Sequence, residues 1–290
     1  MSDTPAKAVI PLAVTDHRRD ILGFQYVYPV VSRRAGGVSV GINLNPNNAC
    51  NWRCIYCQVP DLTRGNAPEI DLALLEEELD ALLNDIVHGD FMARNVPEEV
   101  RRVNDIAFSG NGEPTASRQF GEAIAIAAKL MKKYRLLGSI KLVLITNGSQ
   151  LYKPAVQDAV ARMRELNGEV WFKFDRAPVE GYSEVNQIAL TTEQVKRHLA
   201  AATARCTTWI QTCMFAIDGK PPADWEVEAY LGVLTEAAQA DAKPAGVLLY
   251  GLARPSTQPE APRLARAPEE WMQALAARIE ALGLSVKLSL

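Results

Sequence analysis

The segment that decides how this chain is interpreted is Cys50-Asn51-Trp52-Arg53-Cys54-Ile55-Tyr56-Cys57. It places three cysteines in a C-x3-C-x2-C spacing within one short loop. Three thiolates this close together can hold three corners of a cubane iron-sulfur cluster, whose usual complement is four cysteines. One iron then has no protein ligand, which leaves an open metal position for a substrate or a cofactor.

Other uses of this loop agree less well with the sequence. A structural zinc site needs four ligands, but Cys206 and Cys213 lie far along the chain and the three histidines show no ligand spacing. A disulfide framework is not expected in a chain of 290 residues with five cysteines and no secretory signal. We therefore predict one cluster, with Cys50, Cys54 and Cys57 as its ligands.

The composition is that of an ordinary globular protein. With 48% hydrophobic and 22% charged residues, the chain can bury a large core as one domain, with or without a small appendage. The formal charge of −3 gives no basic field of the kind that a nonspecific nucleic-acid binder needs. Pairs such as Arg18-Arg19 are interpreted as solvated faces.

Membrane insertion and secretion are not predicted. No run of about 18 apolar residues occurs, so we expect no transmembrane span. The apolar residues 8–14 contain a proline and are followed by no convincing cleavage site, which favours an edge strand over a signal peptide. Reduced cysteines and an oxygen-sensitive cluster then agree with a cytoplasmic location.

After residue 37 the chain alternates β-rich runs with amphipathic helices, the pattern of a parallel sheet covered by helices. The expected strands are 38–44, 103–109, 141–146, 169–175, 208–216, 245–251 and 284–290. The expected helices are 71–88, 120–131, 156–163, one opened by the capping box of Thr191 and Gln194, 227–234 and 271–282.

Six βα units are fewer than a full eight-unit barrel requires. We therefore predict an α/β protein with a partial (βα)6 TIM-type barrel, parallel strands inside and helices outside. Residues 1–37 are predicted to form a short N-terminal β extension, residues 38–290 the core domain, and the proline-rich residues 253–267 a loop. In such folds the chemistry lies at the carboxyl ends of the strands.

Two glycine-containing turns follow the second and third predicted strands. The first contains Ser109, Gly110, Asn111, Gly112 and Glu113, and its glycines permit left-handed backbone that directs successive N–H and C=O groups at a ligand. The second contains Thr146 and Asn147 followed by a glycine. Either segment alone also agrees with an ordinary tight turn.

The fourth predicted strand carries charge where none is expected. Alternation puts Trp171, Lys173 and Asp175 on one face and three apolar residues on the other. Buried parallel strands are normally apolar on both faces, so the lysine and the aspartate form either a satisfied ion pair or contacts with a ligand.

The last two strands bring further candidates to the same mouth. Gln211 and Thr212 lie on the fifth strand, and Gly251 at the end of the sixth permits close approach of a flat ligand. Arg254 is a candidate for a carboxylate or phosphate, with a surface arginine as the alternative. By geometry we predict that Lys173, Asp175 and Arg254 touch a cofactor or substrate and serve in catalysis.

The C-x3-C-x2-C loop with Tyr56 before its last cysteine resembles the signature of the radical S-adenosylmethionine (SAM) superfamily. The resemblance implies a [4Fe-4S] cluster whose open iron is chelated by the amino and carboxylate groups of SAM. An electron from the cluster then cleaves SAM to methionine and a 5′-deoxyadenosyl radical. It also implies an external one-electron donor such as flavodoxin or ferredoxin.

The resemblance extends to cofactor contacts. Tyr56 is expected near the adenine, and the 110–114 segment resembles the G-G-E-P segment that binds the methionine amino group, with Asn111 in place of the first glycine. Asparagine tolerates positive φ, which makes that exchange acceptable. The complete predicted set of cofactor-binding residues is Tyr56, Ser109, Gly110, Asn111, Gly112, Glu113, Thr146, Asn147, Lys173, Gln211 and Gly251.

Within the superfamily the chain is most similar to the wyosine-synthase-like group of iron-sulfur oxidoreductases. The segments that carry this likeness are residues 39–44, 112–115 and 146–149. Wyosine synthases join pyruvate to a methylated guanosine of tRNA and carry a second cluster on upstream cysteines. Residues 1–49 contain no cysteine, which argues against that reaction.

The sequence thus predicts a radical SAM enzyme with one cluster and an undetermined substrate, whether a small molecule, a peptide or tRNA. Wyosine-type modification of tRNA guanosine is one alternative. An iron-sulfur electron carrier without SAM chemistry is another, and SAM cleavage distinguishes it from both enzymes.

Overall fold

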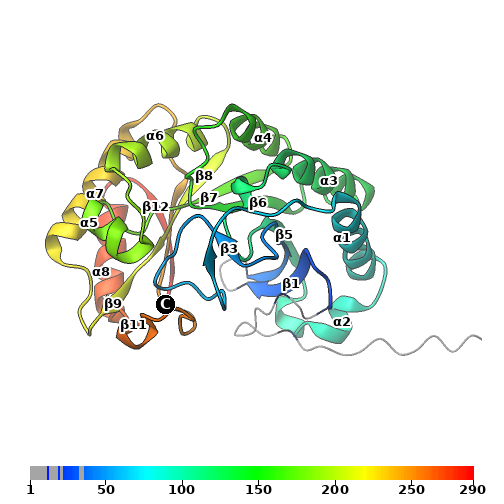
Figure 1. Cartoon of the computed structure of the whole chain (residues 1–290), viewed down its shortest axis with the longest axis horizontal. Helices are drawn as coiled ribbons and strands as arrows, with labels where there is room; N and C mark the ends of the chain where they lie inside the picture. Colours follow the sequence, from blue (N-terminus) through cyan, green and yellow to red (C-terminus); the bar gives the residue numbers. More distant parts are fainter. Residues whose placement is uncertain (1–11, 13–18, 20–21, 33–35) are drawn as a thin grey trace, which may run out of the picture.

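The protein is built around an eight-stranded sheet that curls into a half-barrel (Figure 1). The computed structural model describes residues 12, 19, 22–32 and 36–290. In spatial order the strands are β1 (Val27–Ser32), β2 (Gly37–Ile42), β5 (Val103–Phe108), β6 (Lys141–Thr146), β7 (Gly168–Lys173), β8 (Thr207–Cys213), β10 (Gly246–Tyr250) and β12 (Ser285–Ser289). Every neighbouring pair is parallel except β1 and β2. The predicted partial barrel is confirmed.

Helices cover the outer face of this sheet, as Figure 1 shows. They are α1 (Leu72–Val87), α3 (Phe120–Lys133), α4 (Pro154–Arg164), α6 (Thr192–Thr203), α7 (Asp224–Gln239) and α8 (Glu269–Glu280). The predicted capping box is present, because Thr191 accepts from the Gln194 backbone while the Gln194 side chain accepts from the Thr191 backbone. Each predicted helix is confirmed. The apolar residues that recur at helical spacing form the face that packs on the sheet.

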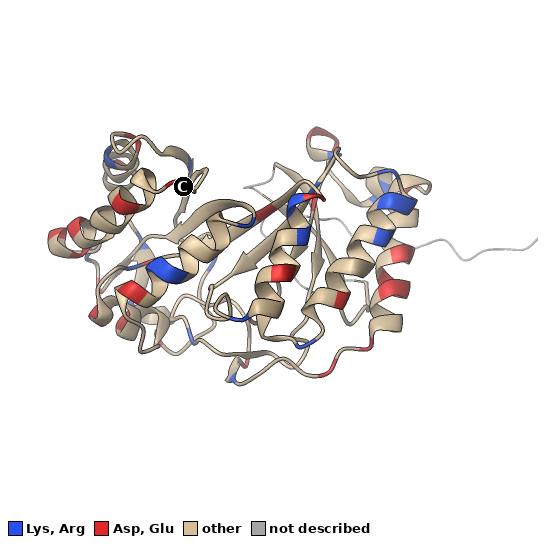
Figure 2. Cartoon of the chain, turned by 90° about the horizontal axis from the view of Figure 1, so that it is seen from above, with Lys and Arg blue, Asp and Glu red and all other residues tan. Residues whose placement is uncertain are grey.

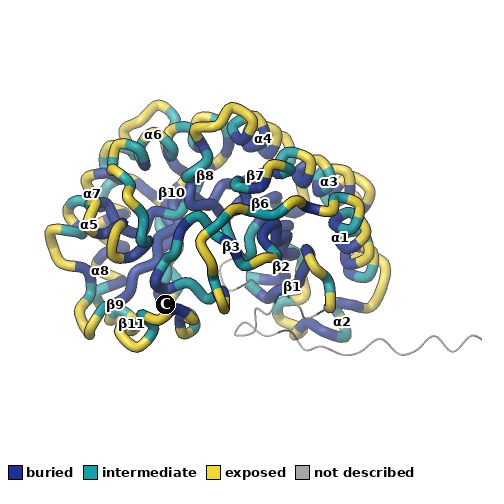
Figure 3. Tube along the Cα trace, in the orientation of Figure 1, coloured by how far each residue is buried: buried dark blue, intermediate teal, exposed yellow. Residues whose placement is uncertain are grey.

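Alternation along the strands separates two apolar regions. Residues such as Val40, Phe108 and Phe172 point outward and pack with the helices in the main core. A smaller cluster around Trp171 and Leu248 lies on the inner face of the half-barrel. Figure 3 shows the resulting pattern, with buried strands surrounded by helices whose outer sides are exposed.

β1 lies within the predicted N-terminal β extension and joins the barrel sheet beside β2, but its bounds were not predicted. Its start is held by Glu78 of α1, whose buried carboxylate accepts hydrogen bonds from the backbone N–H groups of Gln25 (2.7 Å), Tyr26 (2.8 Å) and Val27 (3.2 Å). The edge strand predicted at residues 8–14 lies outside the described residues, apart from Leu12.

Two further predictions about segments need correction. The predicted strand 208–216 divides into β8 and β9 (Phe215–Ile217), and the predicted loop 253–267 contains β11 (Leu264–Arg266), which pairs antiparallel with β9. Pairing with a distant segment stabilises these short strands, so local sequence does not reveal them. Near the cysteines, β3 (Ala49–Cys50) pairs with β4 (Thr63–Arg64), which closes the cysteine loop at its base.

The helices carry both acidic and basic residues (Figure 2). Figure 2 shows acidic and basic residues interspersed along the helices. In the part of the chain that the structure describes, no helix has both the length and the apolar character needed to cross a bilayer.

Candidate functional site

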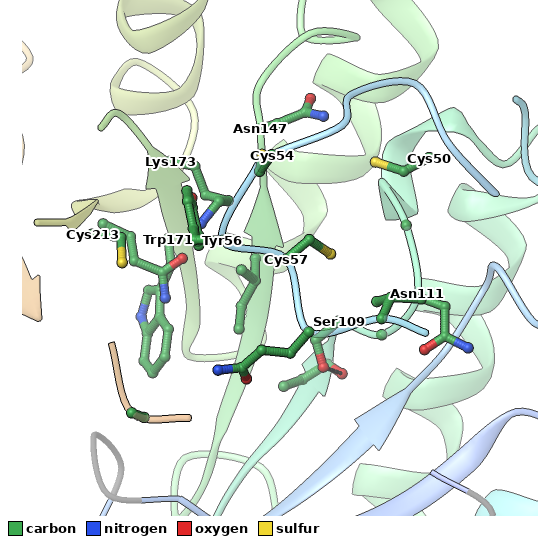
Figure 4. Close-up of a pocket in the computed structure, with 18 of the residues that line it drawn as sticks. Cys50, Cys54, Tyr56, Cys57, Ser109, Asn111, Asn147, Trp171, Lys173 and Cys213 are labelled. Carbon is green, nitrogen blue, oxygen red and sulfur yellow. Dashed lines mark hydrogen bonds between the residues drawn. The ribbon is translucent and has the colours of Figure 1, made fainter. Parts of the chain in front are cut away.

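The cysteine loop lies over a cavity of about 320 Å³ at the carboxyl ends of the parallel strands. All three cysteines of the loop line this cavity, together with side chains from several strand ends (Figure 4). The volume is at the lower end of the range that holds drug-sized ligands. The cavity therefore has room for a small ligand at the carboxyl ends of the strands, where this fold class places its active sites.

Two of the three sulfurs receive N–H donors. The Trp52 backbone N–H lies 3.5 Å from Cys50 Sγ, and Asn186 Nδ2 lies 3.2 Å from Cys54 Sγ. Burial raises the pKa of the Cys50 thiol to about 12 and that of Cys54 further. Binding a metal therefore has to displace protons, and N–H donors stabilise the thiolate that results.

The three thiols suit a cluster better than a single ion. Among the described residues no group of three His, Cys, Asp or Glu side chains is arranged to hold one metal ion. In a cubane each thiolate binds a different iron, so the sulfurs do not need to converge on one point. Cys50, Cys54 and Cys57 are all partly exposed to the cavity, which fits this donor set.

Neighbouring segments fix the cysteine loop from two sides. The Ile55 N–H donates to the Val185 carbonyl (2.9 Å), and the Arg53 N–H to that of Asn186 (3.3 Å). On the other side the Ser256 hydroxyl donates to the carbonyl of Ile55 (2.7 Å) and to that of Cys57 (3.0 Å). The positions of the cysteines therefore depend on segments that lie far apart in the sequence.

Glu113 joins the two glycine-containing turns. Its carboxylate, 2% exposed, accepts from the Thr146 hydroxyl (2.6 Å), the Asn147 N–H (2.7 Å) and the Thr115 N–H (3.1 Å). Burial raises the pKa of Glu113, and these donors counteract the rise. Thr146 is itself 1% exposed and lies beside Glu113 without lining the cavity, whereas Asn147 lines it and donates to Asn51 of the cysteine loop (2.9 Å).

The turn at 110–112 uses its glycines differently from the prediction. Gly110 has φ +130°, but Asn111 and Gly112 are not left-handed, so asparagine's tolerance of positive φ is not what admits Asn111. Gly112 is required for close approach, because a Cβ there would lie 2.2 Å from the Ala49 carbonyl oxygen. Among the described residues, Asn111 Oδ1 is buried without a hydrogen-bond partner. It therefore offers an unused acceptor beside the cavity.

This close approach predicts the effect of Gly112→Ala. We expect a loss of about 1–3 kcal/mol in the free energy of unfolding, because the added methyl forces the strand at Ala49 away. Denaturant unfolding measures it. Gly121→Ala is the matched control, since a Cβ on Gly121 of α3 meets nothing within 4 Å. Equal stability of the two variants would contradict the tight contact.

Lys173 lies inside the cavity wall between two aromatic rings. Its Nζ is 5.0 Å from the centroid of the Tyr56 ring and 5.9 Å from that of Tyr250, and it donates to the Tyr250 hydroxyl (3.2 Å). Burial opposes its charge, but Tyr250 and Asp175 raise the pKa of Lys173 overall. Lys173 therefore places an amine with donor capacity in the wall of the cavity.

Asp175 and Arg254 occupy different positions from Lys173. Asp175 is 1% exposed and accepts from the Tyr56 hydroxyl (2.5 Å), Asn186 Nδ2 (3.1 Å) and the Cys213 N–H (2.9 Å). Its carboxylate therefore orients the groups around the cysteine loop. Arg254 lines the cavity, and its backbone carbonyl accepts from Gln58 Nε2 (3.0 Å).

Most of the remaining predicted residues come together at the cavity, but Thr212 does not: alternation turns it to the other face of β8, where its hydroxyl bonds the Phe174 carbonyl (2.9 Å) and the Tyr230 hydroxyl of α7 (2.8 Å). Tyr56 lines it while packing its ring against Phe215, with a centroid distance of 5.3 Å. Ser109 shares a hydrogen bond with the Tyr28 hydroxyl (2.8 Å). Gln211 is 1% exposed, and neither polar atom of its side chain has a hydrogen-bond partner in the described part of the chain. Gly251 also lines the cavity, at the end of β10.

Several cavity residues escaped the sequence reasoning. Arg19 and Tyr28 of the N-terminal extension and Asp105 on β5 line the cavity and were not predicted to do so; Arg19 was expected on a solvated face. Asn186, which donates to Cys54 Sγ of the cysteine loop, was not predicted either. Tyr250 was part of a predicted strand end but was not singled out. An inward polar residue on a buried strand, which identified Lys173, could also have indicated Asp105.

Three cysteines thus lie at one cavity above the strand ends of an α/β half-barrel. The Radical SAM superfamily model matches residues 44–231, and the chain belongs to this superfamily. In sequence, it is 32% identical over 130 residues to a protein from Brachyspira hyodysenteriae named GTPase Obg, covering 43% of this chain and 16% of that relative. It is 28% identical over 160 residues to a UPF0026 protein of Helicobacter pylori, covering 55% of this chain and 45% of the relative.

The chain therefore spans less than half the length of these curated relatives. Among solved structures it is similar to TYW1 with a lysine-pyruvate adduct bound, with a TM-score of 0.55 and 15% identity. That match covers 85% of this chain and 74% of the other. At this level of identity the likeness shows the shared fold.

Proposed function

We propose that the protein binds one [4Fe-4S] cluster through Cys50, Cys54 and Cys57 and cleaves SAM reductively. The observation that carries this proposal is the placement of three thiols around one cavity, with N–H donors on two of the sulfurs. Once bound, the reduced cluster and SAM supply a 5′-deoxyadenosyl radical, as in the superfamily to which the chain belongs. Cys206 and Cys213 are buried thiols, of which Cys213 also lines the cavity, and the proposal does not include them in the ligand set.

The polar residues of the cavity then bind and orient SAM. Lys173 provides a positive charge for its carboxylate, and the backbone turn at Gly110 to Glu113 provides a rigid edge for its amino group. Asn111 Oδ1 and the side-chain amide of Gln211 are buried without hydrogen-bond partners among the residues that the structure describes, so a ligand that pairs with them removes an unfavourable burial. Tyr56 and Gly251 offer flat contact surfaces for the adenine.

The same proposal assigns the surroundings of the enzyme. The single electron comes from an external donor such as flavodoxin or ferredoxin, and the protein acts in the cytoplasm, where its thiols stay reduced. The substrate class is undetermined. The lysine-pyruvate adduct belongs to the TYW1 structure.

The experiment is an anaerobic SAM cleavage assay. Protein reconstituted with iron and sulfide, reduced and mixed with SAM is expected to form 5′-deoxyadenosine and methionine, even slowly without substrate. The control is the same protein without reductant. A reconstituted sample that carries the cluster but neither binds nor cleaves SAM would support an iron-sulfur electron carrier instead.

A further inference from the structure

Asn186 is a buried amide that connects an acidic residue to a cysteine sulfur. Its side chain is 1% exposed, and Nδ2 lies 3.2 Å from Cys54 Sγ and 3.1 Å from Asp175 Oδ2. The carboxylate only accepts, so the NH2 group and not the carbonyl of the amide must face it. The two hydrogens of one NH2 group can therefore serve Asp175 and Cys54 together.

The backbone around Asn186 keeps this amide in place. Tyr182–Asn186 form a short π-helical segment, and Gln187 after it is left-handed with φ 51°. Single π turns are rare and occur frequently at functional sites. The carbonyls of Val185 and Asn186 accept from the cysteine loop, so the segment is held to the loop without any contribution from the Asn186 side chain.

We propose that Asn186 tunes the reduction potential of the cluster that Cys54 ligates. This inference depends on the proposed function, because it requires the cluster. A hydrogen bond to a ligating sulfur stabilises negative charge, and the reduced cluster carries more of it than the oxidised one. Asn186 therefore makes reduction easier, and Asp175 acts as the positioning residue that aims its amide at the sulfur.

Asn186→Leu tests this role, since leucine has a similar volume and no donor. We expect the reconstituted variant to retain iron and sulfide at the wild-type level, with the midpoint potential of the cluster shifted to a more negative value. The matched control is Gln187→Ala. Gln187 directly follows Asn186, and its side chain hydrogen-bonds to Arg53 and Glu260 and not to a sulfur. Its midpoint should equal that of the wild type.

An intact cluster with an unchanged midpoint in Asn186→Leu would overturn the proposal. Should that variant lose its cluster, the wild-type protein still gives an answer. With asparagine labelled with 15N at the side-chain amide, electron-nuclear double resonance of the reduced cluster should show a 15N coupling, and its absence would overturn the proposal.

Failure of this inference differs from failure of the proposed function. If the wild type assembles the cluster and cleaves SAM but shows neither the shift nor the coupling, only the role of Asn186 is wrong. A wild type that assembles no cluster would remove the proposed function itself.

Discussion

Alanine at Cys50, Cys54 or Cys57 is expected to abolish the cluster and, with it, all SAM cleavage. Each replacement leaves the loop with two thiols, one ligand fewer than the three corners of the proposed cluster need. Wild-type protein should bind about four irons per chain after anaerobic reconstitution. Iron and sulfide analysis with the visible absorption spectrum measures the loss.

Cys206→Ala is the matched control, because its thiol is buried in the main core and donates to the Gly168 carbonyl (3.3 Å). This variant should keep the cluster. Retention of the cluster in all three loop variants, or its loss in Cys206→Ala with the fold intact, would show that the ligands have been misassigned.

Lys173→Met is expected to leave the cluster in place and to weaken SAM binding about 10- to 100-fold. Methionine preserves the apolar length of the side chain, whereas the hydrogen bond to a charged group is worth about 1.5–3 kcal/mol. Equilibrium binding of SAM to the reconstituted protein measures the change. Lys287→Met on β12 serves as control, since Lys287 lies over the Trp209 ring (4.1 Å) and does not line the cavity.

The alternative for Lys173 is a purely structural charge beside Asp175. In that case Lys173→Met would lower the melting temperature and the cluster content together, while the variant that still folds would bind SAM as the wild type does. This pair of results would remove Lys173 from the cofactor site.

The fold was predictable because its signals are local. Helices such as α1 and α3 show apolar spacing that matches the face they bury, and the parallel strands are short β-rich runs between them. The bounds of β1 were not predictable in this way, because the start of this strand is held by the buried carboxylate of Glu78 on α1. The sequence alone does not distinguish Glu78 from a solvent-exposed glutamate of a helix.

The site was predictable to the extent that the strand ends fix it. The cysteine loop, both turns, Lys173 and Gln211 all lie at one cavity because parallel strands end at one edge. The links between them were not predictable. Glu113 bonding across to Asn147, and Asp175 orienting Asn186, connect residues whose separation in sequence carries no pattern.

We propose that SAM binds at an iron left open by Cys50, Cys54 and Cys57. Electron paramagnetic resonance of the reduced cluster tests this binding most directly. The protein is reduced anaerobically, and its spectrum is recorded with and without SAM. We expect SAM to change the g values of the cluster signal, because SAM becomes a ligand of one iron. Identical spectra at a SAM concentration that saturates binding would contradict it.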